Sequence, residues 1–265
     1  MDFCSIASGS SGNCIFVGSD SSGILIDTGI SKKRIVDGLH EIGRRPEELQ
    51  GILITHEHSD HIQGLGVMSR KYHIPIYATK GTIDGIEQSR SLGVIDAELF
   101  HTISAGSPFF VGDLEVEPFS VSHDAAEPVD YRINSGGTSV GVVTDLGYYD
   151  EHVVSHLKNL DGVLLESNHD IHMLQVGGYP YYLKRRILGE KGHLSNEHAG
   201  RLLCEILHDD MKMVLLGHLS RENNFEALAY ETVCSEVTLG DNPYRAGDFR
   251  IAVAARDERS LLYEL

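Results

Sequence analysis

The sequence predicts an α+β fold, a β-sandwich covered by helices on both sides. Short apolar or alternating runs of strand length recur along the chain, and helical patterns lie between many of them. Strands come first, and helices alternate with strands later, an order that suits such a layered sandwich. No linker, low-complexity tract or internal repeat interrupts the sequence. We therefore expect one domain over residues 1–265.

The N-terminal part begins with strands. Three apolar or alternating runs with Gly/Ser turns between them predict a meander, at residues 4–8, 13–18 and 23–29. Residues 31–43 have apolar residues at helical spacing, with Ser31 as a plausible N-cap. Residues 51–55 are apolar and predict a buried strand. A His-rich turn follows, and then a helix that begins near His61.

The rest of the chain alternates between strand and helix patterns. Residues 98–145 read as strands, with turns at Ser107-Pro108, Gly112-Asp113 and Gly136-Gly137. Further buried strands are predicted at residues 139–145, 161–167 and 212–220. Two helices are predicted at residues 195–207, capped by Ser195, and 223–237.

The composition points to a globular cytoplasmic protein without membrane contact. No apolar run is long enough to span a bilayer, and the first residues lack the features of a signal peptide. The four cysteines are dispersed and form no C-x-x-C pair, which argues against a Cys-rich zinc site and a disulfide framework. The net charge of −17 opposes non-specific binding to a polyanion. That argument weakens if divalent cations dominate the local field of a site.

The most informative segment is Thr55–His61, which contains the pattern His-x-His-x-Asp-His directly after a predicted buried strand. Imidazole and carboxylate groups are natural ligands of zinc, manganese and iron. Side chains alternate in direction along an extended turn. His56 and His58 can therefore point to one metal ion, while Asp60 and His61 serve a second ion nearby.

Three further candidate ligands lie at the ends of apolar strands. His123 follows EPFSVS, Asp145 follows SVGVVT and His218 follows MVLLG. A rigid metal site requires ligands on well-supported elements, and strand ends provide such support.

The His-x-His-x-Asp-His motif, together with His123, Asp145 and His218 in this order, resembles the metallo-β-lactamase-fold hydrolases over essentially the whole chain. The resemblance implies an αββα sandwich of two mixed sheets and an enzyme that uses two divalent ions, zinc or manganese, with iron also suited to the ligands. It implies that one ion binds His56, His58 and His123, that the other binds Asp60, His61 and His218, and that Asp145 bridges them.

More local matches resemble one branch of that family, the nucleases of the YycJ (WalJ) type. They lie at residues 8–13, 24–29, 55–65, 166–170, 177–187, 192–196 and 216–224. This resemblance implies 5′-to-3′ DNA exonuclease activity, a role in DNA repair and a DNA 5′ end as substrate. The expected mechanism is phosphodiester hydrolysis by a hydroxide that bridges the two ions and that Asp60 helps to orient.

Two more residues resemble the proton-donating pair of related tRNA-processing phosphodiesterases. By this resemblance, Glu166 orients His193, and His193 protonates the leaving oxygen. The residues alone leave open that His193 caps a helix and that Glu166 is a surface acid.

Candidate substrate contacts are Ser10, Ser11, Asn13 and His169. The Ser8–Asn13 turn is either a tight hairpin or a nest of amides and hydroxyls that holds a phosphate. His169 either lines the substrate groove or supports the metal ligands. His152 and His156 have a spacing that can chelate a metal, but a surface helix is the favoured interpretation.

Rival functions use the same pattern. A hydrolase of a small thioester or lactone would need the same ions. A di-iron oxidoreductase would have Glu where His58 stands, and a non-catalytic scaffold would have lost ligands. Only 73 positions separate Asp145 from His218, so no inserted clamp domain fits there. DNA contacts must then come from this domain or from a homodimer.

Overall fold

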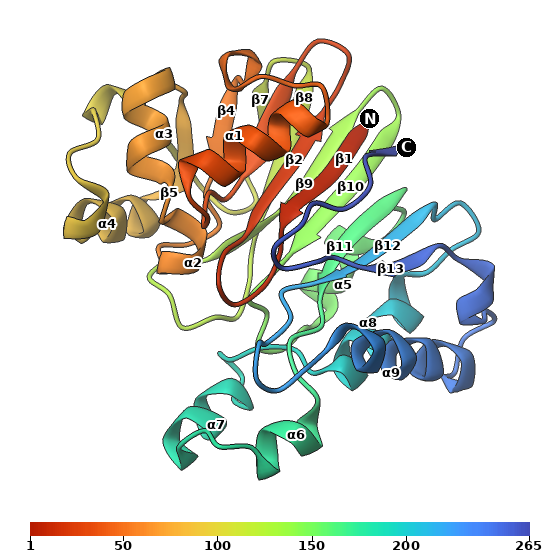
Figure 1. The fold of residues 1–265 in the computed structure, drawn as a ribbon. Helices are drawn as coiled ribbons and strands as arrows, with labels where there is room; N and C mark the ends of the chain where they lie inside the picture. The colour runs from red at the N-terminus through yellow and green to blue at the C-terminus, as the bar shows by residue number, and fades with distance from the viewer.

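Two seven-stranded β-sheets pack face to face in the computed structural model, which describes residues 1–265 (Figure 1). The first sheet consists, in spatial order, of β14 (Tyr263–Glu264), β1 (Asp2–Ala7), β2 (Cys14–Gly18), β3 (Gly23–Ile26), β4 (Gly51–Leu53), β5 (Ile76–Thr79) and β6 (Phe100–Ile103). The second consists of β13 (Ile251–Val253), β12 (Met213–Gly217), β11 (Gly162–Glu166), β10 (Thr138–Val143), β9 (Val129–Ser135), β8 (Leu114–Ser120) and β7 (Phe109–Val111).

Both sheets are mixed, with an antiparallel and a parallel half. Strands β14 to β3 pair antiparallel and β3 to β6 pair parallel. In the second sheet β7 to β10 pair antiparallel and β10 to β13 pair parallel. The predicted αββα sandwich of two mixed sheets flanked by helices is therefore confirmed.

Helices cover both outer faces of the sandwich (Figure 1). Those packed on the first sheet are α1 (Lys32–Glu41), α3 (Leu65–Tyr72) and α4 (Lys80–Gln88), and those on the second are α5 (Glu151–Leu157), α8 (Asn196–Ile206) and α9 (Glu226–Leu239). The remaining helices are α2 (Ser59–Ile62), α6 (Ile171–Val176) and α7 (Tyr181–Ile187), with 3₁₀ turns at Pro46–Glu48, Arg90–Leu92, Ala97–Leu99 and Ala246–Asp248. No helix has the length and apolarity that crossing a bilayer requires.

The continuous apolar runs of the sequence follow from this layering. Side chains alternate between the faces of a strand, so Ile24 and Ile26 of β3 pack between the sheets while Leu25 packs beneath the helices. Both faces of the inner strands are dry, and strands buried on both faces are apolar at every position. Three apolar layers result, one between the sheets and one under each group of helices.

Helix boundaries agree with the predicted caps. The Ser31 side chain accepts a hydrogen bond from the Arg34 amide, and Ser195 accepts one from the His198 amide. The helix expected near His61 begins at Ser59. The helix expected from residue 223 begins only at Glu226. The Asn224 side chain, just before it, is buried and donates to carbonyl groups outside the helix.

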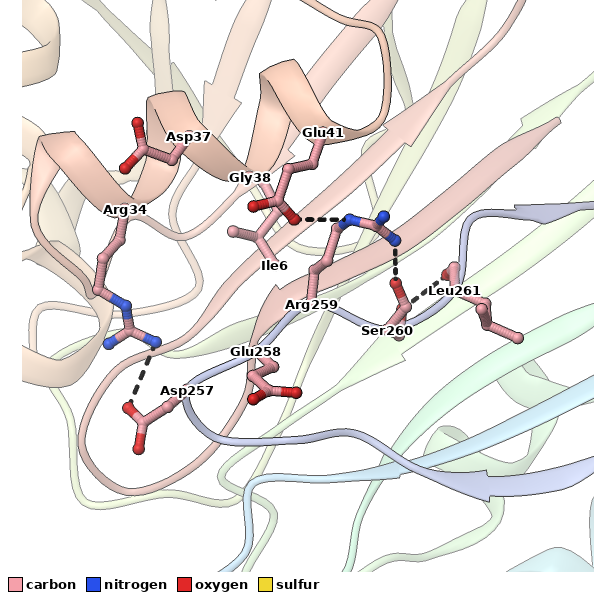
Figure 2. Close-up of a pocket in the computed structure, with 10 residues that line it drawn as sticks. All are labelled: Ile6, Arg34, Asp37, Gly38, Glu41, Asp257, Glu258, Arg259, Ser260 and Leu261. Carbon is pink, nitrogen blue, oxygen red and sulfur yellow. Dashed lines mark hydrogen bonds and ion pairs between the residues drawn. The ribbon is translucent and has the colours of Figure 1, made fainter.

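The C-terminal segment is clamped against α1 around a polar pocket of about 510 Å³ (Figure 2). The two arginines that line this pocket are paired with acids from the opposite segment. Arg34 Nη2 of α1 lies 3.4 Å from Asp257 Oδ1, and Arg259 Nε lies 2.9 Å from Glu41 Oε2 of α1. None of the predicted site residues lines this pocket. We infer that these ion pairs hold the chain end in place rather than bind a ligand.

Candidate metal centre

Strand ends from both sheets meet at one place. The segment that follows β4 of the first sheet carries the histidine motif and leads into α2. The second sheet supplies His123 shortly after β8, Asp145 after β10 and His218 directly after β12. Strands β4, β8, β10 and β12 end on the same side of the sandwich. Polar side chains that are far apart in the sequence therefore lie together at one site.

The structure arranges six of the predicted ligands as two sets of donors. The first donor set is His56, His58 and His123, and the second donor set is Asp60, His61 and His218; within each, the donor atoms lie within 4.8 Å of one another. In the first set, His123 Nε2 is 3.2 Å from His58 Nδ1. In the second, Asp60 Oδ2 is 3.6 Å from both His61 Nε2 and His218 Nε2.

Asp145 lies between the two donor sets. Its Oδ1 is 3.6 Å from His123 Nε2 in the first set. Its Oδ2 is 2.8 Å from His61 Nε2 and 3.5 Å from His218 Nε2 in the second set. One carboxylate thus presents a different oxygen to each set, which is the arrangement that a bridging ligand needs.

Asp27 orients the histidine motif through hydrogen bonds to Thr55 and His61. Its Oδ2 accepts hydrogen bonds from His61 Nδ1 at 2.7 Å and from the Thr55 hydroxyl at 2.9 Å, while its Oδ1 accepts from the Thr55 amide. A carboxylate can only accept, so the Nδ1 proton is fixed and Nε2 faces the donor set. The sequence patterns leave Asp27 unassigned, although, like Asp145, it is an acid after an apolar run.

Replacing Asp27 with asparagine is expected to weaken metal affinity about 10- to 100-fold. An amide has only one acceptor oxygen, so its NH2 group would face either the Thr55 amide or the His61 Nδ1 proton, both of which are donors. Competition with a fluorescent chelator measures the affinity. Asp241→Asn, at an exposed acid, is the matched control. Equal affinities in the two variants would show that Asp27 does not position His61.

Glu166 connects two histidines and is fully buried. Its Oε1 accepts from His218 Nδ1 at 2.8 Å and from His193 Nδ1 at 2.9 Å. Its Oε2 accepts from the amides of Leu146 and Leu194. Glu166 is therefore not a surface acid, and the predicted contact with His193 is present. Because Glu166 also accepts from His218 Nδ1, it orients a residue of the second donor set as well as His193.

The charges around Glu166 and His193 favour their ionised forms. Burial raises the pKa of Glu166, but the charges and hydrogen bonds of His193 and His218 outweigh this and lower it. Burial lowers the pKa of His193, but Glu166 and Asp145 outweigh this and raise it well above its usual value. His193 does not cap a helix, since Ser195 is the N-cap of α8. It is thus free to act as a proton donor.

Three residues of the centre have left-handed backbone conformations. Asp27, Asp145 and His218 have φ angles of 60°, 56° and 55°. A non-glycine residue in this region costs on the order of 1–3 kcal/mol and persists where its surroundings fix it. The His218 amide, for example, donates to Ser8 Oγ at 2.8 Å. Backbone strain is therefore found at three residues of the candidate metal centre.

The Ser8–Asn13 turn packs against the histidine motif. The Asn13 amide donates to the Asp60 carbonyl at 2.8 Å, and Asn13 Nδ2 lies 3.2 Å from His61 Nε2. Asn13 is thus buried at the centre, whereas Ser10 and Ser11 are exposed in the same turn. A side chain at Gly29 would collide with this contact, because a Cβ there would be 1.6 Å from the Asp60 carbonyl oxygen.

The variant Gly29→Ala is therefore expected to displace Asp60 and to lose metal and thermal stability together. Metal content per chain and the melting temperature test this. Gly247→Ala is the control, since a Cβ at Gly247 would meet nothing within 4 Å. Normal metal content in Gly29→Ala would contradict the expected displacement.

The other predicted histidines lie outside the donor sets. His169 is buried beside the segment of His193 and Ser195, and burial lowers its pKa to about 4, so it is neutral at physiological pH. His152 and His156 lie on α5, as the predicted surface helix requires, and His156 Nε2 is 3.5 Å from Glu117. A cavity of about 500 Å³ opens beside His123 and is also lined by Tyr148 and Lys191.

The residues present fit divalent metal ions. The Nε2 atoms of His56 and His218 are buried and have no hydrogen-bond partner. Buried polar atoms without partners are costly, so two such nitrogens aimed at one centre indicate a ligand that accepts their lone pairs. Imidazole nitrogens with carboxylate oxygens suit zinc, manganese or iron.

Comparisons with known proteins agree with this chemistry. A family model for the β-lactamase superfamily domain matches residues 23–218. Exodeoxyribonuclease WalJ of Streptococcus pneumoniae serotype 2 is 40% identical over 260 residues, which cover 98% of this chain and 96% of that protein. Exodeoxyribonuclease YycJ of Bacillus anthracis is 40% identical over 233 residues, 88% of each chain. Among solved structures, Zn²⁺-bound PqqB from Methylobacterium extorquens shares the fold, with a TM-score of 0.71, 16% identity and full coverage of both chains.

Proposed function

The chain belongs to the β-lactamase superfamily of metal-dependent hydrolases, and on this premise we propose that it is a DNA exonuclease that removes nucleotides from a 5′ end. The observation that carries the proposal is the pair of donor sets joined by Asp145, in a chain that is 40% identical to two exodeoxyribonucleases.

The two donor sets would hold two divalent ions, zinc or manganese, with Asp145 shared between them. When bound, such ions acidify water and stabilise negative charge that develops on phosphate oxygens. Iron would suit the same mixture of nitrogen and oxygen donors.

Asp60 is the residue that would orient the attacking water. Burial raises its pKa, but the neighbouring His61 and His218 side chains outweigh this and lower the pKa below its usual value. Asp60 therefore stays ionised and can accept a hydrogen bond from water. Its side chain is partly exposed, whereas the neighbouring donors are buried, so it faces the side from which substrate arrives.

His193 would protonate the leaving oxygen of the phosphodiester. Its Nδ1 is held by Glu166, which leaves Nε2 as the atom that can meet the substrate. The side chain is slightly exposed and the raised pKa keeps it protonated. A positioned acid of this kind contributes typically about 10²- to 10⁴-fold to a rate.

The Ser8–Asn13 turn would hold the terminal phosphate. Asn13 Nδ2 is a donor next to His61, and the hydroxyls of Ser10 and Ser11 are exposed on the same turn. Amide and hydroxyl donors grouped in a turn form a concavity suited to an anion. His169, which lies beside His193, would support that segment.

Linear DNA with a 5′-phosphate tests the proposal. After chelation, the chain should release no nucleotide, and added Mn²⁺ or Zn²⁺ should restore release from the 5′ end, as shown by placing a label at either end of the strand. A thioester serves as the comparison for a small-molecule hydrolase. Absence of nucleotide release under every metal condition would overturn the proposed function.

A further inference from the structure

The α6–α7 hairpin (residues 171–193) differs in charge from the rest of the chain. It contains four basic residues and one acid, for a net charge of +3, so the remaining residues together carry −20. It also contains three of the eleven tyrosines. Its helices lie beyond the layers formed by the two sheets and the other helices (Figure 1).

The base of the hairpin is fixed to the candidate metal centre. Arg186 Nη2 lies 2.9 Å from Asp124 Oδ1, next to His123. Ser122 Oγ donates to the Glu190 carbonyl, and His123 Nδ1 donates to the Gly192 carbonyl at 3.1 Å. A molecule bound along the hairpin therefore has a short path to the first donor set.

Two tyrosines on α7 are exposed to an unusual degree. The exposed fractions are 77% for Tyr181 and 74% for Tyr182. Residues four apart share a helix face, so Tyr182 lies one turn before Arg186, and Tyr181 lies one turn before Arg185. Two adjacent stripes of α7 thus each combine an aromatic ring with a guanidinium group.

The cations of the hairpin divide into anchored and free groups. Lys184 Nζ donates to the carbonyls of Gln175 and Gly177, and Arg186 pairs with Asp124. Arg185 and Lys191 are exposed and make no such contact. Lys191 also lines the 500 Å³ cavity beside His123. Unpaired positive charge is therefore present both on α7, at Arg185, and beside the metal centre, at Lys191.

We propose that the α6–α7 hairpin is a docking platform for single-stranded DNA, on which Tyr181 and Tyr182 stack bases while Arg185 and Lys191 bind backbone phosphates. The inference rests on the proposed exonuclease function, since it supplies the path by which a strand reaches the metal centre. Exposed rings beside cations bind single strands without regard to sequence, because every base has a stacking face. A basic hairpin on an otherwise acidic surface also confines a polyanion to this route.

Binding of a 3′-labelled single-stranded oligonucleotide to the chelated full chain tests the platform. The double variant Tyr181→Ala/Tyr182→Ala should lose roughly five- to 150-fold in affinity for each base that no longer stacks. Tyr181→Phe/Tyr182→Phe should retain affinity, because stacking needs only the ring. Tyr230→Ala, at an exposed tyrosine on α9, is the control. Arg185→Ala should lower the slope of log affinity against log salt concentration by about 0.7.

Turnover separates the platform from the chemistry. With metal restored, the alanine double variant should show a raised KM for the oligonucleotide and an unchanged rate on a small chromogenic phosphodiester. Unchanged oligonucleotide affinity in that variant would overturn the proposal. If the variant also changed from dimer to monomer at unchanged affinity, the hairpin would be a contact between subunits instead. If the wild-type chain releases no nucleotide, the proposed function fails, and loss of binding in the double variant still supports the platform.

Discussion

Replacing Asp145 with alanine should remove metal binding and hydrolysis together, with a loss of rate on the order of 10³-fold or more. Asp145 gives one oxygen to the neighbourhood of His123 and the other to that of His61 and His218. Its removal takes a negative charge and a shared donor from both sets at once. Metal content measured by mass spectrometry should fall by at least one ion per chain, in parallel with activity on 5′-phosphorylated DNA.

A matched control separates this effect from general loss of stability. Asp96→Ala also removes an acid, one whose side chain accepts a hydrogen bond from the Glu98 amide at a surface turn far from the donor sets in sequence. It should retain metal and activity. Full metal content with normal turnover in Asp145→Ala would mean that Asp145 does not join the two donor sets.

Replacing Glu166 with glutamine should lower kcat about 10²- to 10³-fold and also weaken metal binding about 10- to 100-fold. The same oxygen accepts from His193 and His218, and a neutral amide cannot stabilise a protonated His193 as a carboxylate does. Saturating metal should restore ion content but not kcat.

The pH profile identifies the part of this effect that passes through His193. Glu166 and Asp145 raise the pKa of His193, so the proton donor is lost only as pH rises through that raised value. Removing the Glu166 charge lowers the pKa of His193 and should move the alkaline limb of kcat to lower pH. His193→Ala should lose kcat while keeping its metal. An unshifted alkaline limb in Glu166→Gln would separate Glu166 from proton transfer.

The local elements and the donor residues could be predicted because their signals are local. Ser31 and Ser195 precede amphipathic runs, and Asp145 and His218 follow apolar runs that only buried strands explain. Such patterns depend on neighbours in the sequence, which a single chain displays in full. The fold family then followed from the order of these residues.

Other features depend on contacts between distant residues and leave no local signal. Glu166 resembles any acid after an apolar run, and only the packing around it decides that it is buried beneath two histidines. Asp27 acquires its role from a left-handed φ and from Thr55, which is 28 positions away. The pairing of β14 with β1 joins the chain ends and has no sequence pattern of its own.

The origin of the donors in two different sheets has a mechanical consequence. His56 and His61 lie in the segment that follows β4 of the first sheet, whereas His123, Asp145 and His218 follow strands of the second. Bound ions would act as cross-links between the halves of the sandwich, and a ligand that binds only the folded state stabilises it by mass action. Depletion of these ions would therefore weaken the contact between the two sheets as well as stop catalysis. The lifetime of the protein against proteolysis would then depend on metal supply.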